Sequence, residues 1–386
     1  MKSIYFLTIV LLVFALSQPC AHAQAQGGSD ASSGNTNQSW TATTQQQLPS
    51  NQNPTRTSET HTDSGGHTID NQSMQAMGTD GRYDPYLDVQ KETVKVDATT
   101  TRTVERTFGR DSEGRKTLVQ VTEKETRTLP GGEVKVVRTT SDPDANGALQ
   151  PVQRETQDTR QLSPNVQETR STLLTASPNG GLTPSLQTTD RETKTGDRNV
   201  EFHKSTSLPD SNGNWQLNEV REGTVKDDGK DRTKEERVLR PGTDGNLSVV
   251  ERTVSKESEN AAGEKRETVA TYSTNFPGTP IDDSLHLNQE VTTVHRKSAD
   301  GVQSTQTLVE QRNPAEPGGS LQVTQKAIDI VRPGSSGTTR ETQTLESLDS
   351  NGELGVVSVD TRKQDNTPAV HVDIAPAKTP QPTPAR

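Results

Sequence analysis

The amino-acid sequence predicts an all-β protein, an up-and-down antiparallel array of about sixteen strands. Three observations support this class. Tight-turn sequences recur along the chain, they repeat at a spacing of about 33 residues, and the segments between them are rich in Thr and Val. Asp-Gly and Asn-Gly tolerate the positive φ of hairpin turns, and β-branched residues favour strands. A fixed period of this length is typical of repeat architectures.

The first part of the chain precedes the array. Residues 1–23 are predicted to be a signal peptide, because Lys2 precedes a short apolar run and Ala21-His-Ala23 fits a small-x-small cleavage site. Residues 24–81 are rich in Gln, Ser, Thr, Asn and Gly, and we expect a disordered leader there. Cleavage after Ala23 would leave no Cys and no transmembrane segment, which excludes disulfides and thiolate chemistry from the mature chain.

The array is assigned to residues 82–363, and one copy of the repeat, residues 240–274, shows its pattern clearly. The copy has the order turn, strand, turn, strand, and Asp244-Gly245 stands ahead of an alternating run. The apolar residues that follow the corresponding turns are Leu149, Leu182, Trp215, Leu247, Leu321 and Leu354. A second turn in mid-copy divides each repeat into two strands of about ten residues.

Neither face of the predicted strands is cleanly apolar. In residues 233–240, charged side chains fall on both faces. Because a conventional sandwich requires an apolar face on each sheet, we expect an elongated, twisted sheet, largely single-layered. Closure into a tube and folding into two layers are alternatives, since open sheets of more than about ten strands usually curl.

The tail and the composition limit the remaining choices. Residues 364–386 are Pro-rich and are predicted to be disordered. Only 26% of residues are hydrophobic and 3% aromatic, so a wholly disordered chain is the alternative to the array. The net charge of −10 argues against nucleic acid as a partner, which would require a basic surface.

A possible calcium site is formed by Asp142, Asp144 and Asn146, which match the first half of a D-x-D-x-N-G loop. Oxygen ligands at alternate positions suit Ca²⁺. The twelfth position is Gln153, where an EF-hand has Glu. Turn chemistry alone explains the same residue types. We therefore predict no cofactor and keep these three residues as a metal candidate.

The known patterns of catalytic residues are missing from the sequence. The sequence contains no Ser-His-Asp spacing, paired carboxylates or phosphate-cradling Gly loop. A regular sheet without a pocket is also a poor host for chemistry. The sequence therefore predicts a protein that is not an enzyme.

The turns DANGAL, DSNGNW and DSNGEL resemble the YD-repeats of large bacterial surface and toxin proteins. The Tyr-Asp pair of that family is missing from each copy and the period here is longer, so its shell-forming role is not carried over. Residues 99–362 are more similar to uncharacterised secreted bacterial proteins of tandem polar β-hairpin repeats, with strands such as VERTV. That resemblance implies an architecture and no activity.

Together these features predict an exported, non-enzymatic repeat protein that is secreted, periplasmic or on the cell surface. It would act as an envelope or extracellular scaffold, with an envelope protein, a polymer or its own copies as the partner. One alternative is a porin-like outer-membrane barrel, although this requires an apolar outward band and aromatic girdles. The other alternative is a calcium-stabilised surface repeat protein.

Overall fold

In the computed structural model, the residues described are 38–47, 54–111, 113–274, 284–313, 318–334, 338–349 and 352–368. The chain divides into two units, 1–35 and 36–386, and all described residues belong to the second. The predicted signal peptide and residues 369–386 of the predicted tail lie outside the described residues. No helix in the described part of the chain is long and apolar enough to cross a membrane.

The described residues form twenty strands, which follow one another in up-and-down order. The strands are β1 (Gln38–Gln47), β2 (Thr55–Asp63), β3 (His67–Met77), β4 (Tyr83–Lys95), β5 (Thr100–Arg110), β6 (Lys116–Thr128), β7 (Val134–Pro143), β8 (Leu149–Ser163), β9 (Val166–Ala176), β10 (Leu182–Lys194), β11 (Val200–Pro209), β12 (Trp215–Asp227), β13 (Asp231–Pro241), β14 (Leu247–Glu259), β15 (Lys265–Ser273), β16 (His286–Lys297), β17 (Gln303–Arg312), β18 (Leu321–Pro333), β19 (Thr339–Leu348) and β20 (Leu354–Pro368). The prediction of an all-β antiparallel fold is confirmed.

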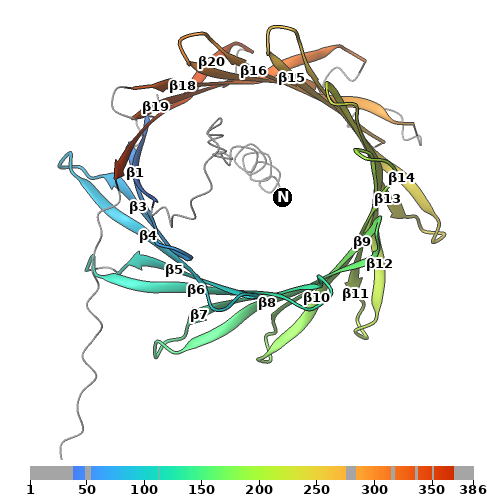
Figure 1. The fold of residues 1–386 in the computed structure, drawn as a ribbon, viewed down its shortest axis with the longest axis horizontal. Helices are drawn as coiled ribbons and strands as arrows, with labels where there is room; N and C mark the ends of the chain where they lie inside the picture. Colours follow the sequence, from blue (N-terminus) through green and yellow to red (C-terminus); the bar gives the residue numbers. More distant parts are fainter. Residues whose placement is uncertain are drawn as a thin grey trace, which may run out of the picture. The chain divides into compact units, whose positions relative to one another are not determined.

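The sheet closes into a barrel. Each strand pairs antiparallel with the next, and β1 pairs with β20 from Gln38↔Pro368 to Gln47↔Val359 (Figure 1). The prediction of an open sheet of about sixteen strands is wrong, and the alternative of a closed tube is confirmed. Closure is favoured because an open sheet leaves rows of unpaired N–H and C=O groups on two edge strands.

The additional strands come from the segment predicted to be a disordered leader. Strands β1, β2 and β3 lie between Gln38 and Met77, and β20 continues to Pro368, beyond the predicted end of the array. These segments are polar, but β1 and β2 are rich in Thr, and all three strands pair residue by residue with their neighbours. Composition alone could not separate them from disorder, because strands of the predicted array, such as residues 233–240, also carry charged side chains on both faces.

Many of the described turns share a five-residue form. In the β7–β8 turn, Asp144 N–H donates to Ala148 O (2.8 Å), Gly147 N–H donates to Asp144 O (2.9 Å), and Gly147 has a φ of 81°. The Asp144 carboxylate accepts the N–H groups of Asn146 and Ala148 at 2.8 and 2.9 Å. Asp210 forms the same bonds in the β11–β12 turn. The repeating Asp-x-x-Gly turns are thus local structures specified by their own side chains.

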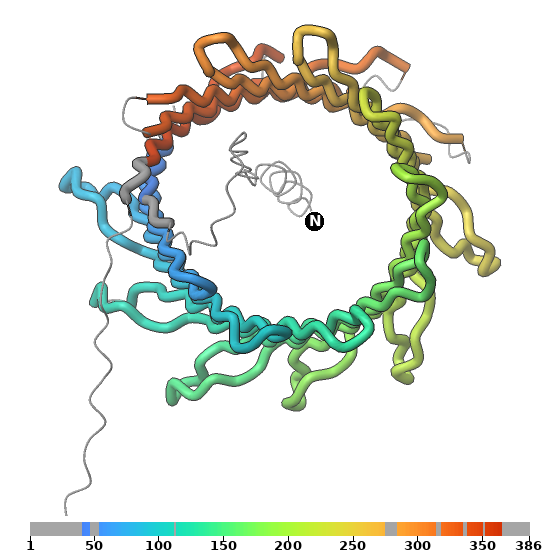
Figure 2. Tube along the Cα trace, viewed as in Figure 1, coloured from blue at the N-terminus to red at the C-terminus, as the bar shows by residue number. Residues whose placement is uncertain are grey.

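One end of the barrel is irregular. All nine hairpins that join an odd-numbered strand to the following even-numbered strand, from β3–β4 to β19–β20, have a register shift before their turn. Elsewhere in the described strands a shift occurs only between β8 and β9. A β-bulge bends its strand, and Figure 2 shows several of these hairpins bending away from the ring.

The described residues contain no large buried core. The buried hydrophobic residues are small: Ala42, Val121, Val220, Val238 and Val309. The wall is a single layer, so its stability comes from backbone pairing and cross-strand side-chain pairs.

Candidate functional site: the barrel wall and its lumen

The register sorts the side chains of the wall into two faces. Across β10 to β13, one row contains Glu192, Phe202, Gly223 and Glu236. We call the face with this row the Phe202 face. The neighbouring row, Arg191, His203, Glu222 and Arg237, belongs to the opposite face, which we call the His203 face.

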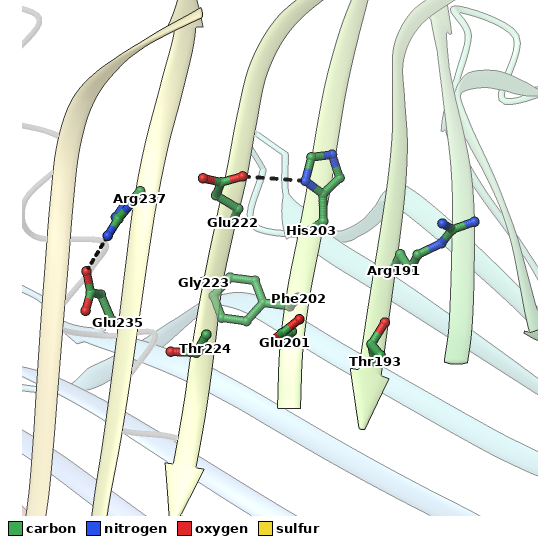
Figure 3. A pocket seen from close by; sticks show the side chains of 10 residues that line it. All are labelled: Arg191, Thr193, Glu201, Phe202, His203, Glu222, Gly223, Thr224, Glu235 and Arg237. Carbon is green, nitrogen blue, oxygen red and sulfur yellow. Dashed lines mark hydrogen bonds and ion pairs between the residues drawn. The ribbon is translucent and has the colours of Figure 1, made fainter. Parts of the chain in front are cut away.

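The handedness of the chain shows which face points outward. In Figure 3 the opposite wall of the barrel lies behind β10 to β13, so this wall is seen from outside. There β11 runs upward with β10 on its right. The Thr195 N–H donates to Asn199 O at 2.9 Å, so the backbone carbonyl of Asn199 points toward β10. Because this direction alternates along a strand, the backbone groups of His203, four residues later, also point toward β10. For L-amino acids this places His203 on the viewer's side, and the Phe202 face therefore lines the lumen.

The lumen side of this wall contains a chain of alternating charges. Glu219 accepts hydrogen bonds from Arg221 (2.7 Å) and Arg240 (3.0 Å). Arg221 also contacts Glu236 (3.1 Å), and Lys234 lies 2.8 Å from the same carboxylate. Such networks hold long side chains in place while leaving the surface hydrophilic.

An aromatic ring interrupts this charged surface. Phe202 lies over Gly223, where a Cβ atom would come within 2.6 Å of the ring carbon Cζ (Figure 3). The Lys234 ammonium is 5.2 Å from the ring centroid. The depression beside this ring has a volume of ≈ 600 Å³. Sequence reasoning missed this contact, although a lone glycine inside a strand is a known signal for a close approach.

The outward face is also charged. Glu235 contacts both Arg237 (3.2 Å) and Arg252 (3.0 Å). Glu168 similarly contacts Arg170 (2.8 Å) and Arg191 (3.2 Å). Along the paired strand residues, acidic side chains outnumber basic ones on the lumen face, and basic ones outnumber acidic ones on the outward face. The net charges of the two faces of the wall therefore differ in sign.

The structure separates the three residues of the calcium candidate. Asp142 lies in β7 and accepts a hydrogen bond from Gln120 (3.1 Å), whereas Asp144 and Asn146 belong to the turn. The Asp144 oxygen Oδ1 is occupied by backbone N–H groups. Within the described residues, no group of three or more His, Cys, Asp or Glu side chains is arranged to hold a metal. Calcium binding stays a prediction.

No protein-family model matches the sequence, and no curated protein matches it. In structure the chain is similar to the siderophore receptor PirA from Acinetobacter baumannii (TM-score 0.50, 7% identity, 87% of this chain and 81% of that chain). It is also similar to the siderophore receptor PirA from Pseudomonas aeruginosa (0.49, 10%, 87% and 82%) and to Pseudomonas aeruginosa OccK5 (0.42, 7%, 87% and 99%). At this identity, the likeness to the first receptor shows the barrel fold alone.

The closed barrel corrects the predicted function. A scaffold that presents one long open sheet to a partner is wrong, because the sheet closes on itself and encloses one of its faces. The resemblance to tandem β-hairpin repeat proteins stays a prediction, since no family model matches.

Proposed function

We propose that the protein is a porin-like barrel whose water-filled lumen lets small hydrophilic solutes cross an outer membrane. Its role is passage and not catalysis, and it belongs at the cell surface. The observation that carries this proposal is the closed ring of twenty strands with a polar, charged lumen face. Barrels of about 16–18 strands already leave an aqueous channel.

The dimensions of the wall agree with this role. Its strands are 9 to 15 residues long, and about 9–11 residues of a tilted strand cross a bilayer. Their number is even, as in bacterial single-chain outer-membrane barrels. The β1–β20 pairing leaves no open edge, which a protein in hydrocarbon requires because no water is there to satisfy backbone groups.

The outward ion pairs are the feature that tests this assignment most severely. An unpaired Arg or Lys facing lipid costs about 2–4 kcal/mol at the middle of the bilayer and much less near its surfaces. Outward arginines such as Arg110 and Arg252 contact carboxylates, which lowers this cost. The same charges favour a second candidate, a hollow conduit that stands in the aqueous envelope with a solvated outer wall.

The two candidates make opposite predictions for the chain without its predicted signal peptide. A porin-like barrel needs detergent to stay in solution, floats with lipid vesicles and releases trapped small sugars from them. A conduit stays folded in detergent-free buffer, remains with the aqueous fraction and leaves vesicles sealed. Far-UV circular dichroism in both fractions identifies the folded barrel. Detergent-free solubility of folded protein with sealed vesicles overturns the membrane proposal.

A further inference from the structure

Exposed apolar side chains gather at one end of the barrel. We call the nine bulged hairpins, from each bulge to its turn, the collar. All of the exposed large hydrophobic residues in the described chain except Val96 and Leu162 belong to the collar. Leu149, Leu217 and Leu247 are 46%, 41% and 43% exposed. The exposed residues of the collar come from six of the nine hairpins and gather at one rim.

Aromatic residues lie on the same hairpins. Tyr83, Phe108, Trp215 and Tyr272 stand at the collar ends of β4, β5, β12 and β15. Two of them contact a cation, since Lys116 lies 4.2 Å from the Phe108 ring centroid and Arg252 lies 5.8 Å from that of Tyr272. Ring, aliphatic chain and cation thus occur together in the collar.

Leu149, Leu217 and Leu247 project from the outward face, as do the four aromatic residues. Leu208, which pairs with Gln216, lies on the opposite face. Leu239, which pairs with Val220 and Val249, follows the same alternation as His203. The pairs that flank the turns, such as Pro143↔Leu149 and Pro209↔Trp215, continue this face. A hairpin that bends away from the ring (Figure 2) turns its outward face toward the opposite end of the barrel. These leucine and aromatic side chains therefore lie on the underside of the collar.

The chemistry of this underside fits a lipid surface. Trp and Tyr prefer the boundary between hydrocarbon and headgroups. Exposed apolar side chains with nearby cations bind anionic lipid surfaces. A second copy stacked tip to tip would meet the Asp-rich turns, including Asp144 and Asp210, and would leave the underside uncovered. Because the underside of the collar faces outward and toward the opposite rim, the partner that it can contact is the membrane around the barrel.

We infer that the collar rests on the surface of the membrane, with its leucine and aromatic side chains among anionic headgroups. This inference rests on the proposed function, because it places a bilayer around the wall. It also gives the barrel an orientation in the membrane. The rim with the collar lies at one membrane surface, and the rim with the other turns lies at the opposite surface or beyond it.

The test uses two variants of the chain without its predicted signal peptide. The collar variant is Leu149→Ser, Leu217→Ser and Leu247→Ser, and the control is Val96→Ser and Leu162→Ser at the other rim. Flotation with vesicles of phosphatidylcholine, with and without phosphatidylglycerol, gives the bound fraction. We expect the collar variant to bind the anionic vesicles about tenfold more weakly and the control to bind as the unchanged protein does. Equal binding of all three proteins overturns the inference.

Two further measurements separate the possible failures. Single-channel conductance of detergent-reconstituted protein tests the pore. Conductance without collar-dependent binding contradicts the role of the collar and leaves the pore intact. Collar-dependent binding without conductance contradicts the pore and leaves the role of the collar intact. In a Trp40→Phe background, Trp215 is the remaining tryptophan, since the chain has 2. Brominated lipids should quench its fluorescence, and absence of quenching contradicts the collar even where the serine variant does not fold.

Discussion

Phe202 on β11 covers Gly223, its direct partner on β12, on the lumen side of the wall. A Cβ atom on Gly223 would come within 2.6 Å of the Phe202 ring and would collide with the backbone oxygen of Glu235. The backbone cannot retreat without disturbing the β12–β13 ladder. This contact is the tightest constraint that a glycine imposes within the strands of the wall.

Gly223→Ala should therefore destabilise the barrel by about 1–3 kcal/mol, the usual cost of overpacking. Gly355→Ala is the matched control, because it lies in β20 and an added Cβ atom there meets nothing within 4 Å. Urea denaturation followed by circular dichroism measures both variants. Equal stability of the two would show that Phe202 moves aside at little cost.

The turn carboxylates predict a loss of stability in acid. The Thr99 backbone N–H and hydroxyl, together with Thr100, lower the pKa of Asp97 to about 2. Backbone N–H groups also lower the pKa of Asp144 and Asp210. A lowered folded-state pKa means that the stabilisation is complete above the unfolded value, near pH 4, and is lost as the pH falls toward 2.

Asp97→Asn should accordingly lower the melting temperature at neutral pH, and the difference from the unchanged protein should shrink between pH 4 and pH 2. A melting series over pH 2–7 measures it. A difference that stays constant across this range would mean that ionisation of Asp97 contributes nothing to the fold.

Burial should separate two outward ion pairs of similar length. Arg110 and Asp88 lie 2.7 Å apart with side chains 19% and 16% exposed, whereas Arg102 and Glu123 lie 2.9 Å apart and are 53% and 52% exposed. Arg110→Met should cost about 1–3 kcal/mol, because Asp88 loses a partner in a half-buried place. Arg102→Met should cost less than about 1 kcal/mol. Equal losses in denaturation experiments would contradict this ranking.

The sign of the lumen charge predicts ion selectivity. Glu257 and Glu267 face each other directly across β14 and β15 on the lumen face, so the excess of acids there should favour cations. Neutralising both, with Glu257→Gln and Glu267→Gln, should lower the ratio of cation to anion permeability by about twofold. The control is Glu222→Gln on the outward face. Reversal potentials in a KCl gradient measure the ratio, and an anion preference of the unchanged protein would contradict the assignment of the faces.

The sequence predicts the local structure of this protein well and its closure poorly. In turns such as 144–148, the local Asp and Gly residues determine the conformation. The positions of the turns, and the β-strands between them, therefore follow from residue types. Closure depends on β1 and β20, which pair although more than 300 residues separate them. Thr-rich polar strands such as β2 carry no apolar alternation, so composition alone indicates disorder there.

The sequence also did not predict the lumen face, for a physical reason. The lumen face exists only after the register places Glu219, Arg221 and Glu236 in one cluster, and alternation within a single strand cannot say which side is enclosed. The collar leucines were visible in the sequence as the residues that follow each turn. Their exposure and common direction depend on the bulges, which the sequence does not mark.

Planar-bilayer recording shows directly whether the barrel forms a water-filled pore. Detergent-purified chain without its predicted signal peptide is added to one side of a bilayer in KCl under a holding potential. A water-filled barrel that inserts one molecule at a time should give stepwise increases in current of uniform size. A folded protein that leaves the bilayer silent at all concentrations would contradict the pore and favour the aqueous conduit.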